Sequence, residues 1–363
     1  MGSEVPNWPR KLPTIKRFFQ VGQSLGLNQD EYFGGLFDLM QKRWGLNEEM
    51  LVHESAETTV ETALSLFETE QQFHPLAPKN PQDRAYWDGQ YPFGRAKELL
   101  HRYIREVLLG SGAVPDHPGE GCPLHAAIAA HLEPSDAVIS FNYDLIMDKA
   151  LKDTGQWNEW LGYSPMTFQK IYHMGHWYDQ PSVSCSSERT YLKLHGSINW
   201  FASTGIRATQ QSADLHRIEQ DPEHPQRRVF SLHSSRAVTR SLEDSEALFE
   251  DQYCEQLLVP PMTHKSYELF RPLWNRAEET LVGAKQLVII GFSFSPADVQ
   301  AQWLLRRGLA QNSNAVSVTL VDPDDQVRQR IKAIVASVNG RHSVQNEYRS
   351  LRDLSQLIFN QLG

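Results

Sequence analysis

Two consecutive strand–loop–helix units near the carboxyl end of the chain limit its fold more than any other feature. Residues 286–290, which are apolar after Gln286, are expected to form a strand, followed by the tight loop Gly291-Phe292-Ser293 and by a helix with Pro296 in its first turn. The second unit has a strand at 316–321 and a helix at 325–338. Strands that are each followed by a helix pair in parallel, because the helix carries the chain back across the sheet. The sequence therefore predicts an α/β fold with a doubly wound, Rossmann-like parallel sheet.

An earlier part of the chain has the same alternation. A helix at 124–132 precedes a buried strand at 137–141, and residues 144–152 return to helical spacing. A further short strand is expected at 191–194, where large apolar residues occur without a breaker. These strands are expected to join the same parallel sheet.

The region between the first helix and these strands has a different pattern of apolar residues. Apolar residues recur at helical spacing from residue 30 to residue 110, and strand signals are weak there. We therefore expect a helical subdomain at 30–110, inserted into a Rossmann-like domain made of residues 1–29 and 111–363. The long polar stretch at 203–255 is expected to be an excursion from that domain or a mobile lid.

Composition excludes several classes of protein. The 363 residues carry a net charge of −9, which argues against a nucleic-acid backbone as the main partner because duplex binding needs a basic face. Cys122, Cys185 and Cys254 lie far apart, which excludes a four-cysteine zinc module and argues against a disulfide framework. This cysteine usage predicts a reducing, cytoplasmic setting. No stretch approaches the ~20 apolar residues of a membrane helix, so we expect a soluble protein.

His195 is the first candidate for chemistry, because it ends the short strand at 191–194 and is followed by Gly196-Ser197. A glycine directly after the ring lets the backbone turn sharply and lets a ligand approach closely. In α/β proteins ligands lie at the carboxyl ends of strands, where an imidazole is well placed for proton transfer. The alternative is a histidine that only caps the strand and bonds the next loop.

Asn142 and Asp144 follow the strand at 137–141 and are the partners that we expect for His195. The amide of Asn142 can both donate and accept a hydrogen bond, which suits it to orient a sugar hydroxyl or a water. Asp144 can brace a neighbouring loop, or it can simply cap the next helix.

Two further loops are candidates for binding. Gly291 allows close approach of the backbone, and the helix after it presents unpaired N–H groups to a phosphate, although an ordinary βα turn has the same composition. The loop lacks the GxGxxG and Walker spacings. Asp322 ends a strand and can accept hydrogen bonds from an adenosine ribose, or it can cap the next helix.

One group of residues resembles a possible metal site. His173 and His176 lie three residues apart and Asp179 follows them. No helix is predicted that would place both rings on one face, and a third ligand is not obvious. We therefore expect no metal.

Four motifs occur in a fixed order along the chain. They are Phe-Asn-Tyr-Asp at 141–144, Leu-Lys-Leu-His-Gly-Ser-Ile-Asn-Trp at 192–200, Ile-Ile-Gly-Phe-Ser at 289–293 and Val-Asp-Pro at 321–323. This order resembles the sirtuin-like domain family, and most closely the branch found in bacterial anti-phage defence proteins that hydrolyse NAD. The resemblance covers residues 135–355.

The resemblance implies a role for each motif. Asn142 would position the nicotinamide ribose or the attacking water, His195 would act as general base, and Asp144 is grouped with them as a catalytic candidate. The residues expected to line the cleft that holds NAD are Gly196, Ser197, Gly291, Phe292, Ser293 and, near the adenosine, Asp322.

The chain departs from the family pattern in two ways. It lacks the four-cysteine zinc module of protein-deacetylating sirtuins, which moves the expectation from deacylation to NAD hydrolysis or a related ADP-ribosyl reaction. Family members also begin with a strand and a Gly-Ala-Gly-x-Ser loop, whereas this chain starts with Met1-Gly2-Ser3. Either the true start lies upstream or the first strand and its glycine loop are lost.

The resemblance, taken with the cysteine content, thus implies a cytoplasmic NAD hydrolase that takes NAD as its substrate and releases nicotinamide and ADP-ribose without a metal. We expect it to be the effector of an anti-phage system and to act as a homo-oligomer or with a defence partner protein. The alternative is a nucleotide-sensing or scaffold subunit that binds NAD or ADP-ribose and a partner protein with little catalysis.

Overall fold

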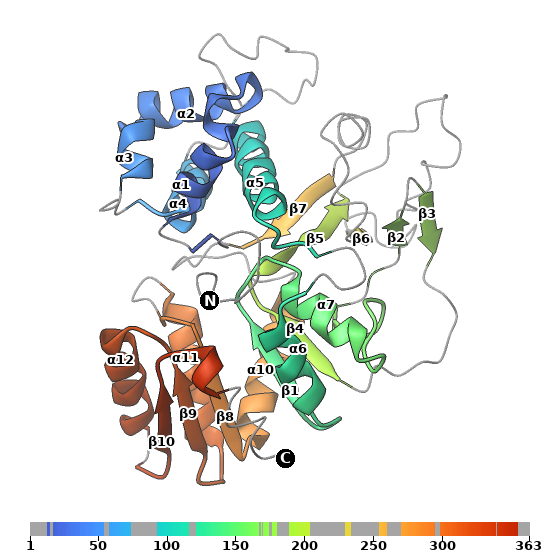
Figure 1. Cartoon of the computed structure of the whole chain (residues 1–363), viewed down its shortest axis with the longest axis vertical. Helices are drawn as coiled ribbons and strands as arrows, with labels where there is room; N and C mark the ends of the chain where they lie inside the picture. The colour runs from blue at the N-terminus through green and yellow to red at the C-terminus, as the bar shows by residue number, and fades with distance from the viewer. Residues whose placement is uncertain are drawn as a thin grey trace.

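The chain folds into a mixed α/β structure in which one group of helices gathers at one end and parallel strands at the other (Figure 1). The computed structural model describes residues 13–14, 17–53, 58–73, 93–115, 121–166, 168, 170–173, 176–179, 189–203, 229–233, 254–259, 270–294, 298–338 and 340–354. No helix among these residues is long and apolar enough to cross a lipid bilayer.

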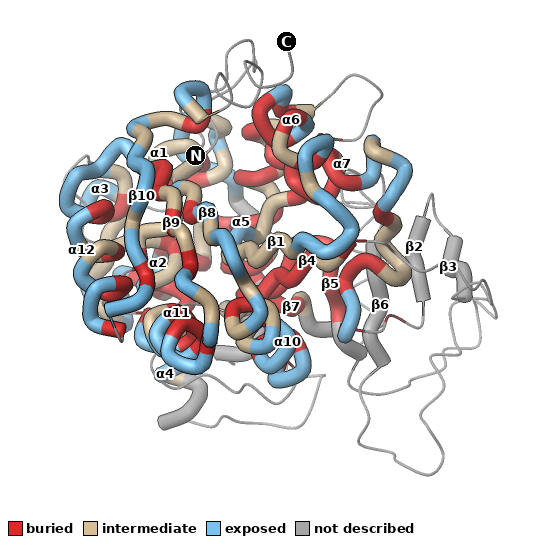
Figure 2. The backbone as a smooth tube through the Cα atoms, turned by 90° about the horizontal axis from the view of Figure 1, so that it is seen from below, coloured by how far each residue is buried: buried red, intermediate tan, exposed pale blue. Residues whose placement is uncertain are grey.

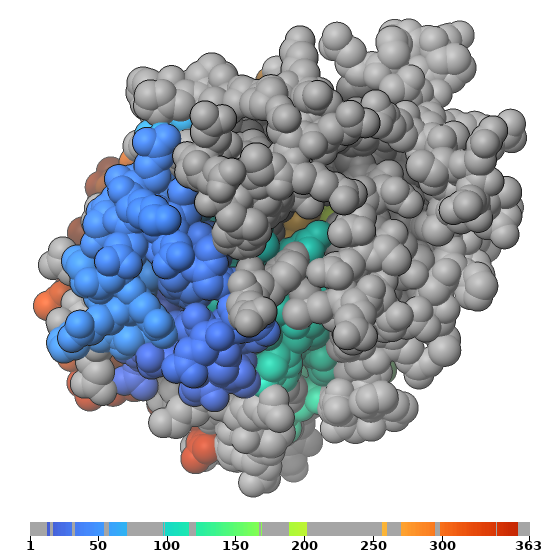
Figure 3. Space-filling view, turned by 90° about the horizontal axis from the view of Figure 1, so that it is seen from above, coloured from blue at the N-terminus to red at the C-terminus, as the bar shows by residue number. Residues whose placement is uncertain are grey.

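The described residues of the amino-terminal part are mostly helical, as the spacing of apolar residues predicts. Figure 3 shows the first of these residues, in blue, side by side on one face of the molecule. Whether residues 30–110 form a separate inserted subdomain stays a prediction. The elements are α1 (Phe18–Ser24), the short 3₁₀ helix η2 (Leu27–Gln29), α2 (Glu31–Trp44), α3 (Glu48–Val52), α4 (Val60–Phe73) and α5 (Phe93–Gly110).

Tyr103 of α5 lies at the centre of the helical core. It is fully buried, and its ring centroid lies 5.8 Å from that of Phe19 and 5.5 Å from that of Phe37. Its hydroxyl donates to Asn28 Oδ1 at 2.5 Å, which satisfies the buried phenol. Gly22 makes room for this group, because a Cβ there would lie 1.9 Å from the hydroxyl oxygen.

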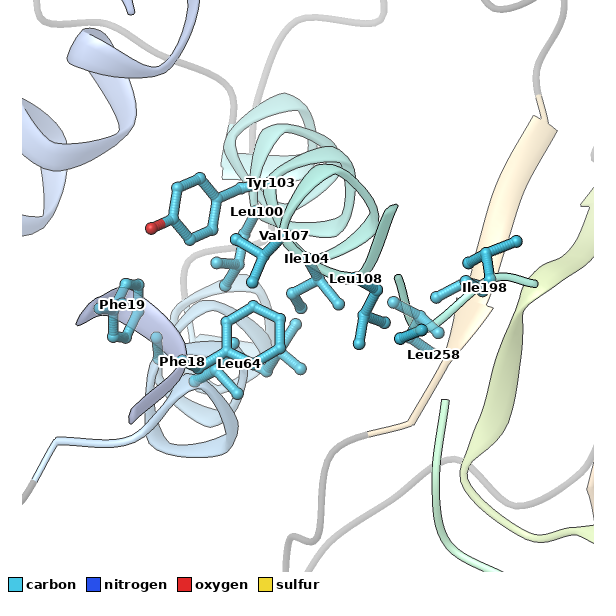
Figure 4. Close-up of a cluster of buried hydrophobic side chains, with 14 of the residues drawn as sticks. Phe18, Phe19, Leu64, Leu100, Tyr103, Ile104, Val107, Leu108, Ile198 and Leu258 are labelled. Carbon is cyan, nitrogen blue, oxygen red and sulfur yellow. The ribbon is translucent and has the colours of Figure 1, made fainter. Parts of the chain in front are cut away.

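The helical core continues into the strands. Leu108 of α5 belongs to the same apolar cluster as Ile198 of β5 (Gly196–Ser203) and Leu258 of β7 (Cys254–Leu258). Figure 4 shows these side chains following one another from the helix to the two strands. Burial of one continuous apolar cluster therefore fixes the helices against the strands.

The predicted parallel pairing is present, in two small sheets. Strand β1 (Ala137–Ser140) pairs with β4 (Thr190–Lys193). Strand β9 (Ser317–Val321) lies between β8 (Gln286–Ile290) and β10 (Ser343–Tyr348), and both of its pairings are parallel. In Figures 1 and 2 the β1–β4 pair lies beside β8, but within the described strands β1 bonds only to β4 and β8 only to β9. The one sheet expected is thus divided in two in the part of the chain that is described.

Helices cover the parallel strands, and burial falls toward the outer edge. Leu320 of β9 is buried with Leu305 and Ile331, which come from two of the covering helices. Strand β10, by contrast, is largely exposed (Figure 2). It was not predicted, because a polar edge strand gives no apolar run. The helices are α6 (Pro123–His131), α7 (Ile146–Asp153), α10 (Arg271–Gly283), α11 (Val299–Gln311) and α12 (Asp325–Ala336).

A third sheet, of mixed direction, was not predicted from the sequence. Its strands have the order β3-β2-β6-β5-β7. Strand β5 begins at Gly196, so the glycine after the histidine starts a new strand instead of a loop. The polar stretch at 203–255 contributes β6 and the start of β7, and the rest of it lies outside the described residues. The new strands are β2 (Lys170–His173), β3 (His176–Asp179) and β6 (Val229–His233).

Burial of His125 in α6 makes the stability of the fold depend on pH. Burial lowers the pKa of this imidazole to about 4, so the ring stays neutral in the folded protein. The unfolded chain binds a proton below about pH 6.5, so this contribution to stability is present above that pH and is lost as the pH falls toward 4. We expect the free energy of unfolding to fall by about 2 kcal/mol from pH 7 to pH 5 through this residue.

Urea unfolding of the wild type and of His125→Gln at pH 7 and pH 5 measures this contribution. The variant should lose less stability on acidification than the wild type. His53→Gln, at an exposed position, is the matched control and should lose as much as the wild type. An unchanged pH dependence in His125→Gln would contradict the prediction.

Candidate functional site

Asn142 and His195 lie at the same edge of the β1–β4 sheet. Ser140, the last residue of β1, is opposite Lys193, the last residue of β4, and each candidate follows two positions later. The N–H of Leu194 donates to the Ser140 carbonyl at 2.9 Å, which extends the pairing past the strand ends. The two candidates therefore follow adjacent carboxyl ends of parallel strands, where α/β proteins hold their ligands.

The ring of His195 is buried, whereas Asn142 is exposed. The ring of Phe141 lies edge-on to the imidazole at 5.0 Å, and that of Tyr143 lies 6.5 Å away. The backbone carbonyl of His195 accepts from the N–H of Val259 at 2.8 Å. The imidazole is therefore closed to solvent, whereas the side chain of Asn142 is accessible.

Gly196 is required by the backbone itself. Its φ of +82° lies in the left-handed region, and a Cβ there would lie 1.9 Å from the carbonyl oxygen of Leu257 in β7. The glycine thus allows the close approach of β5 to β7, and its role beside NAD stays a prediction. Ser197 is fully buried, and its hydroxyl donates to the Tyr143 carbonyl at 3.4 Å. It braces the loop that carries Asn142, and its own binding role also stays a prediction.

Lys193 stabilises the same loop from inside the protein. Its side chain is fully buried, and its ammonium donates to the Asp144 carbonyl at 2.5 Å and to the Asp148 carboxylate at 3.2 Å. The hydroxyl of Tyr191 donates to the same carboxylate at 3.2 Å. Because a buried ammonium is tolerated only when it is paired, these bonds hold β4, α7 and the loop after β1 in one arrangement.

The carboxylate of Asp144 is engaged in local structure. Its Oδ1 accepts from the N–H of Ile146 at 3.0 Å, in the turn that leads into α7, although the N-cap of that helix is Leu145. Burial raises the pKa of this carboxyl above its ordinary value, and the ammonium of Lys193 opposes the rise. A catalytic role for Asp144 stays a prediction.

The loop after β8 packs against the loop after β1. The ring of Phe292 stacks on that of Phe141, with centroids 4.0 Å apart and planes at 13°. Gly291 is exposed and has a φ of +60°, and the Ser293 carbonyl accepts from the Arg330 guanidinium at 2.8 Å. The aromatic stack thus joins the ends of the two parallel sheets beside His195. Direct contact of these three loop residues with a ligand stays a prediction.

Asp298 belongs to the site but was not predicted from the sequence. Its Oδ2 lies 3.2 Å from His195 Nε2, and both side chains are almost completely buried. Its Oδ1 accepts from the N–H of Ala301 at 3.3 Å, so Asp298 is the N-cap of α11. Pro296, which led us to expect an earlier helix start, lies outside the described residues. An aspartate directly before the apolar residues of a helix was the signal that could have found it.

Asp322 lies at the end of β9 in a local hydrogen-bonding setting. Its Oδ1 accepts from the N–H of Asp324 at 2.8 Å, and the guanidinium of Arg328 donates to its backbone carbonyl. Burial raises the pKa of the Asp322 carboxyl. These contacts form the turn that leads into α12, but the N-cap of that helix is Asp324, so Asp322 is not the helix cap. A contact of Asp322 with adenosine stays a prediction.

The possible metal site at His173, His176 and Asp179 lies where the structure describes the backbone and not the side chains. The register of β2 and β3 places His173 opposite His176, but the side chains of both residues and of Asp179 lie outside the described part of the chain. Among the described residues, no group of three or more His, Cys, Asp or Glu side chains could hold a metal ion.

Comparison with known protein families gives a match over the part of the chain that holds the candidate site. Residues 136–339, which include every candidate site residue, match the SIR2-like domain. The chain belongs to the SIR2-like domain family. No curated protein matches the chain at a significant level. Membership links the chain to NAD-related chemistry at the level of the family, and the two small parallel sheets with their helices are consistent with the Rossmann-type fold of a SIR2-like domain.

Replacing Gly196 with alanine tests whether the backbone requires glycine in this SIR2-like protein. We expect the free energy of unfolding to fall by more than about 3 kcal/mol, because both the positive φ and the contact with Leu257 oppose a side chain. Gly340→Ala is the matched control, since Gly340 has a φ of +62° but nothing within 4 Å of a built Cβ. It should lose only about 1–2 kcal/mol. Equal losses in urea unfolding would contradict the role of the Leu257 contact.

Lys193→Met leaves the Asp148 carboxylate buried without its ammonium. We expect a loss of about 3–5 kcal/mol in the free energy of unfolding, because the remaining charge is uncompensated. Lys152→Met is the control, since Lys152 is exposed and pairs with Glu159 at 2.8 Å. It should lose about 0–1 kcal/mol. A Lys193 variant as stable as the Lys152 variant would show that the buried network does not stabilise the loop.

Proposed function

We propose that this chain cleaves the bond between nicotinamide and ribose in NAD and releases nicotinamide and ADP-ribose. The observation that carries the proposal is the placement of Asn142 and His195 after adjacent carboxyl ends of two parallel strands. Membership of the SIR2-like domain family supports NAD as the substrate. The amide and the imidazole also fit the chemistry of a ribose, which offers hydroxyl groups to both.

The reaction needs one group that orients the ribose and one that takes a proton. As the glycosidic bond breaks, nicotinamide leaves with the bonding electron pair and positive charge builds on the ribose. Water then forms the new bond to the ribose carbon and loses one proton. Asn142 can hold a ribose hydroxyl or the water, and a neutral His195 can accept the proton. NAD and water thus give nicotinamide, ADP-ribose and one proton.

Hydrolysis is favoured over protein deacylation by the cysteine content. Deacetylating sirtuins carry a zinc module of four cysteines. This chain has only three cysteines, and no two of them lie at the CxxC spacing of such a module. The proposal includes a role as the effector of a bacterial anti-phage system, in the cytoplasm, as a homo-oligomer or with a partner protein. That part rests on the resemblance of the four sequence motifs to defence-associated members of the family.

A nucleotide-sensing or scaffold subunit is the second candidate. It is favoured by the burial of His195, whose side chain is only 1% exposed and meets the edge of the Phe141 ring. A sensor of this kind would bind NAD or ADP-ribose without consuming NAD. Calorimetry with each ligand, followed by analysis of the products, separates the two candidates.

Nicotinamide release from NAD by the purified chain tests the proposal. We expect Asn142→Ala to lower the rate by at least about 10²-fold, because the ribose and the water are no longer oriented. Its fold should be unchanged, since Asn142 is exposed. Asn346→Ala, at an exposed position in β10, is the matched control and should keep the wild-type rate.

His195→Ala completes the test. It should abolish release, and circular dichroism should show that the variant remains folded. Near wild-type release by either site variant would show that the roles are wrongly assigned. Binding of NAD by a wild-type protein that releases no nicotinamide would favour the sensor instead.

A further inference from the structure

A carboxylate is held against the imidazole that we assign to proton transfer. The Oδ2 atom of Asp298 lies 3.2 Å from His195 Nε2, with 2% of the aspartate side chain and 1% of the histidine side chain exposed. Electrostatic interactions are stronger in such an environment than in water. The two residues lie in separate parts of the chain, one after β4 and one before α11, so only the tertiary fold brings them together.

The described part of the loop after β8, residues 291–294, has an unusual backbone that neighbouring side chains hold in place. Phe294 has a φ of +43°, and among the described residues it is the only non-glycine residue with a positive φ. Backbone strain of this kind costs about 1–3 kcal/mol. The Phe294 carbonyl accepts from the side-chain amide of Gln302 at 3.3 Å. The Ser293 carbonyl accepts from Arg330 at 2.8 Å. Strain of this kind persists only where surrounding contacts hold it, and it is concentrated at functional sites.

The place of Asp298 at the start of α11 fixes the direction of its carboxylate. Its Oδ1 accepts from the N–H of Ala301, which caps the helix. The amino end of a helix carries a partial positive charge, which stabilises an anion there. One carboxylate therefore caps α11 with one oxygen and faces His195 with the other.

Tyr143 does not compete with His195 as the proton acceptor. Its ring centroid lies 6.5 Å from that of the imidazole, and its hydroxyl donates to the Val259 carbonyl at 3.0 Å. Burial raises the pKa of Tyr143 well above its ordinary value, and the charges of Glu61 and Asp298 add to the effect. The phenol therefore stays neutral, with its proton committed to a carbonyl.

We propose that Asp298 is the positioning residue for His195 and fixes the imidazole as the tautomer with its proton on Nε2. The lone pair then lies on Nδ1, so Nδ1 takes the proton that the water loses, and Asp298 stabilises the resulting imidazolium. The functional part of this inference rests on the proposed hydrolysis. The tautomer, by contrast, is a property of the protein without any ligand.

Asp298→Asn tests the inference, because asparagine keeps the oxygen that caps α11 and faces His195 with an N–H donor in place of the carboxylate oxygen. Long-range ¹H–¹⁵N spectra of protein with labelled histidines report the tautomer, and His195→Gln assigns the signal. We expect the proton on Nε2 in the wild type and on Nδ1 in Asp298→Asn. Nicotinamide release should show kcat lower by about 10²- to 10⁴-fold with KM changed less than about threefold.

Asp324→Asn is the matched control, since Asp324 caps α12 as Asp298 caps α11, with its oxygen 2.8 Å from the N–H of Gln326. It should leave both the tautomer and kcat as in the wild type. If Asp298→Asn does not fold, Asp298→Ser takes its place, because serine is also an N-cap residue and lacks the carboxylate. The same two readouts then apply, with loss of the wild-type tautomer signal as the expected result.

The two readouts separate this inference from the proposed function. An unchanged tautomer signal in Asp298→Asn would overturn the inference, whatever the activity. A changed tautomer with kcat within threefold of the wild type would overturn the positioning role. Nicotinamide release that is absent from the wild type would count against the hydrolase, and the tautomer alone would then decide whether Asp298 positions His195.

Discussion

The turn at Leu194 and His195 is the constraint on which the rest of the structure depends, because the chain passes there from a parallel sheet to a mixed one. On one side the N–H of Leu194 extends the pairing with β1, and on the other the His195 carbonyl pairs with Val259 after β7. Gly196 permits the passage, since its positive φ and missing Cβ let β5 approach the Leu257 carbonyl. Two sheets thus fix the backbone of His195, and the direction of its ring follows from the fold.

The same end of β4 receives a carboxylate from each of two helices. Asp148 of α7 pairs with Lys193, and Asp298 at the start of α11 lies against His195. Removing charged groups from water is unfavourable unless they are paired, so each acid constrains the position of its helix relative to β4. The loop that carries Asn142 is held by the first of these networks, through the bond from Lys193 to the Asp144 carbonyl. The buried Lys193–Asp148 pair, which is structural, therefore lies next along β4 to the His195–Asp298 pair, which is the catalytic candidate.

The elements that could be predicted from the sequence are those with an apolar signal and a nearby breaker. The strand at Gln286–Ile290 agrees with its prediction at both ends, and the helices between strands correctly predicted parallel pairing. Strand β5 gave no such signal because it begins with Gly196-Ser197, and β10 gave none because it is polar and exposed. For the site, the predicted strands at 137–141 and 191–194 placed Asn142 and His195 at strand ends, since those positions depend on local sequence. The local sequence could mark Asp298 as a helix N-cap, but its place beside His195 depends on the tertiary fold, which no local pattern encodes.

Burial of His195 beside an exposed Asn142 sets the order in which a ligand can engage the site. In the proposed hydrolysis, a ribose that arrives from solvent can bond to Asn142 first, and it reaches the imidazole only after the packing around that ring, which includes the edge of Phe141, opens. Phe141 is also stacked on Phe292, so its movement is coupled to the loop after β8. Asp298 meanwhile holds the imidazole in place to take a proton from the water that attacks the ribose.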